Sequence, residues 1–122
     1  MNGWIGVDLD GTLAVGYPGV SGEIGPPVAS AVTTVKSLLR RGIDVRIFTA
    51  RAAFGRVAVK AVQAWCQQHL GCALPVTNVK TPDCLLILDD RAISVADSEG
   101  SIRSREAQLT LFVSVANSLA KF

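Results

Sequence analysis

Two pairs of aspartates are the residues of this chain whose type and spacing could do chemistry. Asp8 and Asp10 follow a short apolar run, and Asp89 and Asp90 follow another one far along the chain. Side chains two residues apart at a strand end point the same way, and close carboxylates repel one another, so that one pKa rises. Mg²⁺ prefers oxygen ligands and relieves that repulsion. One carboxylate could then act as a nucleophile while the other handles a proton.

Other residue types near these pairs suit an anionic group such as a phosphoryl group. Thr49 offers a hydroxyl donor and Lys80 an ammonium group, and donors of this kind stabilise charge on phosphoryl oxygens. Gly11 lets the backbone turn close to a ligand. Arg51 and Arg91 each directly follow a polar motif. They could contact substrate or hold the acidic groups in place, and we favour the second role.

The elements that must position these residues alternate between strand and helix patterns. In the first half, residues 3–9 are typical of a buried strand followed by a turn. The glycine-rich stretch 14–25 is typical of a long loop. The prolines at 26–27 predict the start of a helix that stops at Gly42. Residues 43–48 alternate and are rich in β-branched side chains, which predicts a second strand ending at the threonine.

The second half continues the alternation. The pattern predicts a helix over 53–70, a short extended piece over 75–79, a strand over 84–88 buried on both faces, a further strand over 92–96 and a helix over 103–120. The last segment also alternates like a strand in part, but its length favours a helix. Phe54 and Trp65 share one stripe of the helix over 53–70 and are expected in the core.

Alternating strands and helices predict a three-layer α/β/α fold with a parallel, Rossmann-like sheet. The length of 122 residues indicates a single domain over 1–122. In such sheets ligands bind at the carboxyl ends of the strands. Both aspartate pairs and Thr49 follow predicted strands. We therefore expect four carboxylates to meet at one edge around a single Mg²⁺ ion.

The composition is that of an ordinary globular protein, with 49% hydrophobic and 18% charged residues. The three cysteines lack a CxxC spacing and are expected to be reduced thiols. The sequence shows neither a signal peptide nor a run of about 18 apolar residues, which predicts a cytoplasmic protein without a membrane partner. No basic run with interleaved aromatics occurs, so nucleic acid is expected only as a substrate.

Four short motifs of the chain resemble those of the haloacid dehalogenase superfamily in type and in order. They are DLDGT at 8–12, the threonine within IFTAR at 47–51, Lys80, and LILDD at 86–90. The segment from Lys80 to the acidic pair is particularly similar to the deoxyribonucleotidase branch. The resemblance covers the whole chain and implies the fold described above.

The resemblance also implies roles for the site residues. Asp8 would attack phosphorus and form an aspartyl-phosphate, and Asp10 would protonate the leaving group and later activate water. The implied Mg²⁺ ligands are the Asp8 carboxylate, the backbone carbonyl of Asp10, and one or both members of the 89–90 pair. Thr49 and Lys80 would bind phosphoryl oxygens. The presence of Asp10 favours phosphoryl transfer over dehalogenation.

Many members of the superfamily carry a cap domain, but the intervals between the motifs here are too short for one. The resemblance thus implies a capless core with an open site, suited to a small-molecule or polymer-end phosphate ester, or closed by a partner subunit. Hydrolysis of phosphate monoesters is the expected function. A phosphotransferase and a non-catalytic phosphate-binding or interaction module remain alternatives. A receiver domain is disfavoured because its acidic pair precedes the acceptor aspartate. Leu111 and Val115 hint at a dimer contact, although core packing is favoured.

Overall fold

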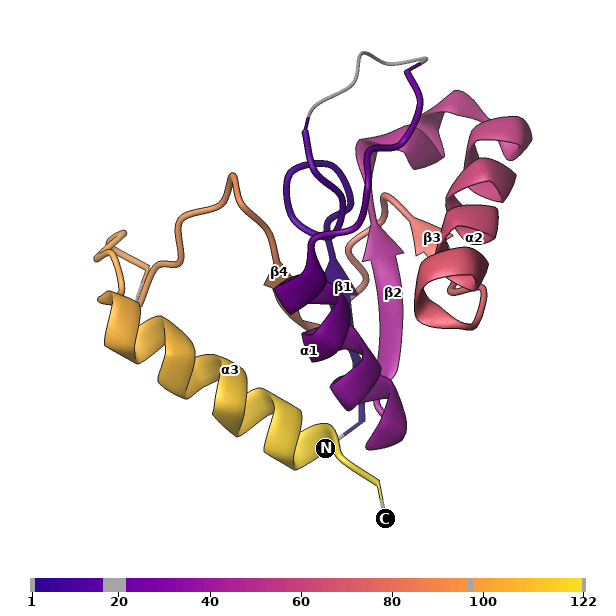
Figure 1. Cartoon of the computed structure of the whole chain (residues 1–122). Helices are drawn as coiled ribbons and strands as arrows, with labels where there is room; N and C mark the ends of the chain where they lie inside the picture. Colours follow the sequence, from indigo (N-terminus) through magenta and orange to yellow (C-terminus); the bar gives the residue numbers. More distant parts are fainter. Residues whose placement is uncertain (1, 17–21, 97, 122) are drawn as a thin grey trace.

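In the part of the chain that the structure describes, four parallel strands form the centre of an α/β fold with three α-helices (Figure 1). The computed structural model describes residues 2–16, 22–96 and 98–121. In chain order the elements are β1 (Trp4–Val7), α1 (Ala29–Arg40), β2 (Asp44–Phe48), the 3₁₀ helix η1 (Ala50–Phe54), α2 (Arg56–Leu70), β3 (Val76–Thr77), β4 (Cys84–Leu88) and α3 (Arg105–Leu119).

The strand order is β3-β2-β1-β4, so the direction of the chain across the sheet reverses between β1 and β4. Val7 pairs with Leu88 at the carboxyl ends of these two neighbouring strands. The ladder continues one residue further, because the backbone N–H of Asp8 donates to the carbonyl of Leu88 at 2.9 Å. Open parallel sheets bind ligands at such a reversal point. The residues that follow β1 and β4 therefore lie where a ligand is expected.

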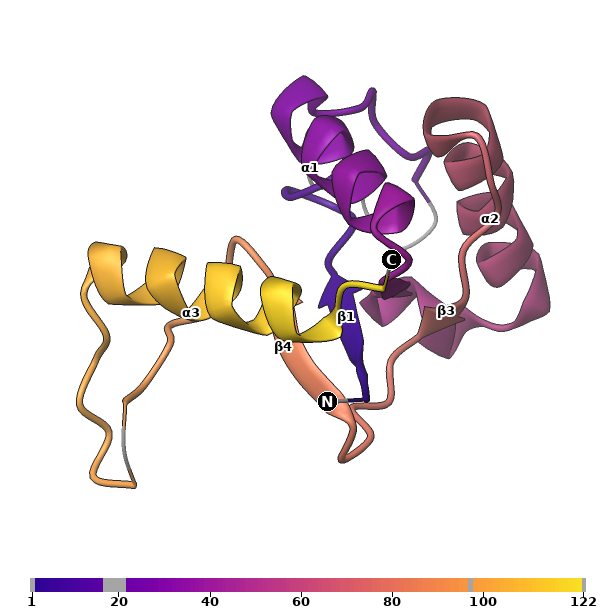
Figure 2. The same cartoon turned by 90° about the horizontal axis from the view of Figure 1, so that it is seen from below.

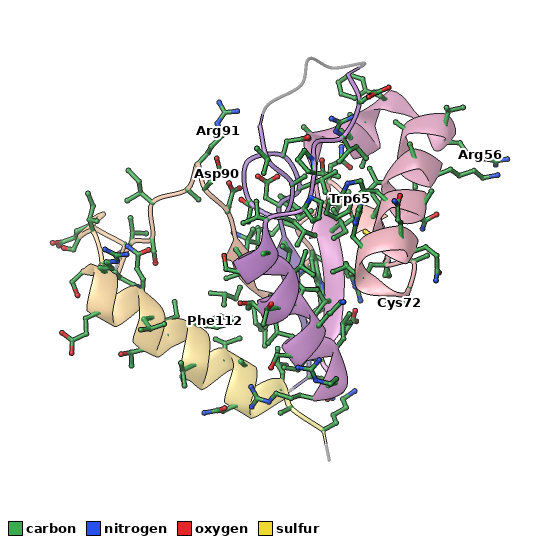
Figure 3. All side chains as sticks on the ribbon, viewed as in Figure 1. Arg56, Trp65, Cys72, Asp90, Arg91 and Phe112 are labelled. Carbon is green, nitrogen blue, oxygen red and sulfur yellow. The ribbon has the colours of Figure 1, made fainter. Side chains whose placement is uncertain are left out.

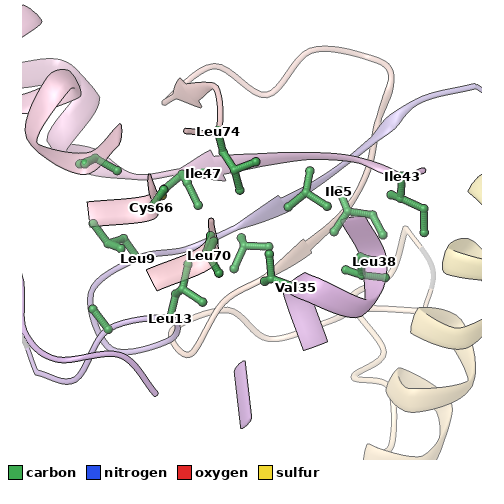
Figure 4. Close-up of a cluster of buried hydrophobic side chains, with 14 of the residues drawn as sticks. Ile5, Leu9, Leu13, Val35, Leu38, Ile43, Ile47, Cys66, Leu70 and Leu74 are labelled. Atoms are coloured by element: carbon green, nitrogen blue, oxygen red, sulfur yellow. The ribbon is translucent and has the colours of Figure 1, made fainter. Parts of the chain in front are cut away.

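One face of the sheet is covered by α1 and α2 (Figure 2). Alternate residues of the two central strands point to this face, because successive side chains of a strand point to opposite sides. Together with the inward stripes of both helices they form the hydrophobic core (Figure 4). Its fully or almost fully buried members include Ile5, Val7, Val35, Leu38, Val45, Ile47, Val62, Cys66 and Leu70.

The opposite face carries Trp4, which is fully buried although no helix lies over it in the described chain. The Arg46 guanidinium sits 4.7 Å from its ring centroid, the Phe48 ring 6.4 Å away, and its indole N–H donates to Thr81 at 2.9 Å. Residues 78–83, which join β3 to β4, contain no helix. A three-layer arrangement is therefore not confirmed; side chains and a loop cover this face instead.

The C-terminal helix α3 confirms the helix predicted over 103–120, with bounds one or two residues shorter. It joins the core through its C-terminal half, where Ala116 and Leu119 are buried and the partly buried Phe112 and Val115 also pack against the core. The N–H of Lys121 donates to the carbonyl of Arg41 at 2.7 Å, and the Arg41 side chain donates to Asn117 at 2.7 Å. The C-terminal end of α3 is thus fastened beside the end of α1.

The helix predicted over 53–70 is divided in two. The short helix η1 ends at Phe54 and α2 begins at Arg56. Gly55 between them has φ 93°, a conformation that glycine adopts readily. Phe54 is 51% exposed, so the prediction that it lies in the core is wrong, whereas Trp65 is buried as predicted.

Two strand predictions in the second half fail for a common reason. Residues 92–96 form no strand, only an isolated bridge between Val95 and Ile102. Strand β4 therefore has no further neighbour among the described residues and is an edge strand. All five of its residues are partly buried, not buried on both faces as predicted. The extended piece predicted over 75–79 is confirmed by β3.

Among the described residues between β1 and α1, the start of the helix differs from its prediction. Pro27 forms a bridge with Ala14, and α1 begins at Ala29. The helix stops before Gly42, whose φ of 75° is consistent with the predicted end. Residues 17–21 of the predicted loop lie outside the described residues. Among the helices that the structure describes, none has the length and apolar character needed to cross a lipid bilayer.

Candidate active site

Three carboxylates meet at the carboxyl ends of β1 and β4. One oxygen each of Asp8, Asp89 and Asp90 lies within 4.8 Å of the others. Asp8 directly follows β1, and the pair follows β4 on the loop where Figure 3 labels Asp90 and Arg91. The structure brings these two segments together as the sequence predicts, because β1 and β4 are neighbours. We call Asp8, Asp89 and Asp90 the acid triad.

The acid triad places Asp8 in an unfavourable environment for a charged carboxylate. Partial burial is the largest cause, followed by the hydrogen bond with Asp90 and the charge of Asp89, and together they raise the pKa of Asp8 from 3.8 to about 7. A positive charge between the three carboxylates would lower the pKa of Asp8 again. The donor set consists of carboxylate oxygens alone, which fits a hard divalent cation such as Mg²⁺.

Thr12 links the members of the acid triad, a role that the sequence analysis missed. Its hydroxyl lies 3.0 Å from a carboxylate oxygen of Asp90 and 3.5 Å from one of Asp8. The same hydroxyl oxygen accepts the backbone N–H of Asp90 at 3.0 Å. One side chain thus ties the loop after β1 to the loop after β4. The only signal in the sequence is its position at the end of the DLDGT motif.

A tight turn after β1 fixes Thr12. The Leu9 carbonyl accepts N–H bonds from Thr12, Leu13 and Ala14 at 2.9–3.2 Å, and Leu9 and Leu13 are fully buried. Gly11 has φ 86°, where other residues are strained, and its N–H donates to the Ala14 carbonyl at 2.8 Å. Gly11 thus shapes the turn that holds Thr12, and its predicted role beside a phosphate stays a prediction.

The Asp10 carboxylate lies outside the acid triad, so three of the four expected carboxylates meet in this structure. Arg51 holds both of its oxygens, with Nε to Oδ2 at 2.8 Å and Nη2 to Oδ1 at 2.9 Å. The third guanidinium nitrogen donates to the Gly22 carbonyl at 2.9 Å. The Arg51 side chain is only 11% exposed. Bidentate pairs of this kind fix orientation as well as charge, and the predicted pairing of Arg51 with an acid is confirmed.

The remaining predicted site residues are Thr49, Lys80 and Arg91. Thr49 is buried after β2, and its hydroxyl accepts the backbone N–H of Arg51 at 3.2 Å, which caps η1. Lys80 is exposed on the loop before β4 and forms no ion pair with any residue the structure describes. The backbone N–H of Arg91 donates to Asp89 at 2.8 Å, while its side chain points away from the sheet (Figure 3).

The raised pKa of Asp8 predicts how stability depends on pH without a cation. Between pH 3.8 and about 7 the folded state binds more protons than the unfolded state, so the free energy of unfolding falls as pH rises through this window. Urea unfolding of chelator-treated protein across that range measures this slope. Asp8→Asn should flatten the slope. Asp44→Asn, which changes an exposed carboxylate at the opposite strand ends, should leave it in place; an unchanged slope in Asp8→Asn would contradict the pKa assignment.

Comparison of the chain with protein-family models, with curated proteins and with solved structures gives no match.

Proposed function

We propose that this protein is a Mg²⁺-dependent phosphohydrolase of the haloacid dehalogenase type that cleaves phosphate monoesters through an aspartyl-phosphate on Asp8. The observation that carries the proposal is the acid triad at the reversal point of a parallel sheet. Asp89 and Asp90 lie close enough to the half-buried Asp8 to share a cation with it. Another aspartate, Asp10, follows Asp8 two residues later in the chain. Strand order 3-2-1-4 is also what a Rossmann-like core with this site would require.

The residues proposed to hold Mg²⁺ are the acid triad, with the backbone carbonyl of Asp10. When bound, the cation would keep Asp8 ionised and would offset negative charge on the phosphoryl oxygens. The Asp10 side chain is not needed for this, because it lies outside the acid triad and is bonded to Arg51. The two aspartates of the first motif therefore have separate tasks.

In the first step an Asp8 carboxylate oxygen forms a bond to phosphorus while the bond from phosphorus to the ester oxygen breaks. Asp10 gives a proton to the departing oxygen. In the second step Asp10 takes a proton from water, the water oxygen bonds to phosphorus, and the phosphorus–Asp8 bond breaks. Inorganic phosphate and an alcohol leave, one water is consumed, and both aspartates return to their starting states.

Arg51 is proposed as a positioning residue for Asp10. It occupies one lone pair on each carboxylate oxygen, and each oxygen keeps another that can carry the transferred proton. Thr49 lies one residue from the η1 helix, and its hydroxyl keeps a proton to donate to a phosphoryl oxygen. Lys80 stands on an exposed loop and would complete the phosphate contacts when substrate binds, as catalytic hydrogen bonds often tighten only in the complex.

Solvent access favours hydrolysis over transfer to another acceptor. Asp90 is exposed and the described residues contain no cap over the acid triad. Transferases keep water away from their intermediates, and nothing in the described part of this site does so. Water is then the acceptor that reaches the aspartyl-phosphate most readily.

The direct test measures release of nitrophenol from p-nitrophenyl phosphate by the purified chain. Turnover should require added Mg²⁺, fall to background with excess EDTA, and return when Mg²⁺ is restored, because the cation keeps Asp8 ionised. Circular dichroism at each stage controls for unfolding by the chelator. Turnover that ignores EDTA would contradict the metal assignment. A folded protein inactive on a broad panel of phosphate esters would favour a non-catalytic phosphate-binding module.

A further inference from the structure

A cavity of about 1180 Å³ lies between the edge strand β4 and the N-terminal half of α3. Its walls are mainly apolar, with Leu86 and Leu88 on the strand side and Leu109, Leu111 and Phe112 on the helix side. Figure 3 shows Phe112 pointing from α3 toward the sheet. Small-molecule sites are typically concave, apolar and of this size or somewhat smaller.

The cavity widens in one direction because α3 diverges from the sheet. Ala116 and Leu119, near the C-terminus of the helix, are 2% and 4% exposed, whereas Leu109, which lines the cavity nearer the N-terminus, is 62% exposed. Figure 1 shows the same divergence, with the N-terminal end of α3 far from the strands. The cavity is therefore a wedge whose narrow end is the buried contact of α3 with the core.

The wide end of this wedge adjoins the acid triad. Asp89 belongs to the triad and also lines the cavity, and it directly follows Leu88, the last apolar residue of β4. Lys80, on the loop before β4, lines the cavity as well. An ester with its phosphate at the acid triad could thus extend its organic group from Asp89 along β4 into the wedge, toward the end of the strand where Lys80 lies.

Resting on the proposed function, we propose that the substrates are phosphate monoesters of single-chain apolar alcohols, with the apolar group bound between β4 and α3. The phosphate end and the apolar end of such a molecule match two adjoining surfaces of opposite character. A hydrophilic sugar phosphate would leave the wedge walls without a partner. Burying apolar surface of substrate and protein together is favourable in proportion to the area removed from water.

The test is a series of ethyl, hexyl, octyl and decyl phosphates with Mg²⁺. Because the wedge is open on one side, we expect each added pair of methylene groups to gain about half of the free energy of complete burial. This corresponds to a rise in kcat/KM of about fourfold for each pair. Leu109→Gln should flatten this rise. Val57→Gln is the matched control, since Val57 is an 84% exposed apolar residue on α2 and does not line the cavity; it should keep the rise unchanged.

A second measurement separates this inference from the proposed function. Calorimetric titration with decylphosphonate, which has no ester bond to hydrolyse, should show binding that Leu109→Gln weakens and Val57→Gln does not. Such binding without any turnover would support the wedge and overturn the phosphohydrolase. Turnover that is independent of chain length, without phosphonate binding, would overturn the wedge and keep the phosphohydrolase. A dimer in sedimentation experiments that Leu109→Gln dissociates would assign the wedge to a second copy of the chain and overturn the ligand proposal.

Discussion

Asp8→Asn is expected to lower kcat/KM for p-nitrophenyl phosphate by about 10⁴-fold or more, the scale of removing a nucleophile from an enzyme. An amide oxygen has nearly the same shape as the carboxylate but is a poor nucleophile, so the variant should fold and fail at the first step. The free energy of unfolding should even increase, because the substitution removes a carboxylate whose pKa is raised to about 7 by its surroundings.

Two measurements distinguish a lost nucleophile from a lost fold. Acid-quenched wild-type protein should carry phosphate from labelled substrate on residue 8, and Asp8→Asn should carry none. Asp44→Asn changes an exposed carboxylate that pairs with Arg46 at 2.8 Å, at the amino end of β2, and should keep kcat/KM within about twofold, as surface substitutions usually have small effects. Full activity in Asp8→Asn would remove the proposed mechanism.

The position of the acid triad could be predicted because it depends on local patterns and on one rule of topology. Asp8 and the 89–90 pair each follow a short apolar run, and such runs are recognisable as strands from the sequence alone. Parallel strands have their carboxyl ends at one edge of the sheet. No knowledge of side-chain packing was needed to place these three residues near one another.

The pairing of Asp10 with Arg51 and the bridging role of Thr12 required the structure. Asp10 and Arg51 are 41 residues apart, and Thr12 and Asp90 are 78 apart. Whether such side chains meet depends on rotamers and on the register between β1 and its two neighbours. The sequence motif placed Asp10 in the site but could not show that its carboxylate turns toward Arg51, not toward the acid triad.

The strand predicted over 92–96 shows a different limit of prediction from the sequence. Strand propensity is strongly context-dependent, because strands are stabilised by cross-strand neighbours. Here Val95 finds only Ile102, in an isolated bridge. As a result β4 stays at the edge of the sheet, and the apolar residues of the predicted strand line or flank the wedge. The error in the fold prediction and the cavity beside the acid triad have the same origin.

Asp10→Asn is expected to have an effect that depends on the leaving group. Alkyl phosphates release a basic oxygen that needs a proton, so their kcat/KM should fall by about 10²–10⁴-fold, the usual contribution of a general acid. Nitrophenolate leaves without a proton, so p-nitrophenyl phosphate should still phosphorylate Asp8. Removal of the phosphoryl group needs an activated water in both cases. Stopped-flow absorbance should therefore show a burst of nitrophenolate followed by a slow steady state.

The Mg²⁺ requirement of Asp10→Asn, compared with that of Asp90→Asn, serves as the control. The Asp10 carboxylate is bonded to Arg51 and lies outside the acid triad, so Asp10→Asn should leave the Mg²⁺ concentration for half-maximal burst amplitude unchanged. Asp90→Asn should raise that concentration, because it removes a charged oxygen from the triad. If Asp10→Asn instead raised the Mg²⁺ concentration for half-maximal burst amplitude as much as Asp90→Asn does, all four carboxylates would share the cation. The division of tasks between Asp8 and Asp10 would then be wrong. An equal loss for alkyl and nitrophenyl substrates, without a burst, would show that Asp10 acts before phosphorus is attacked.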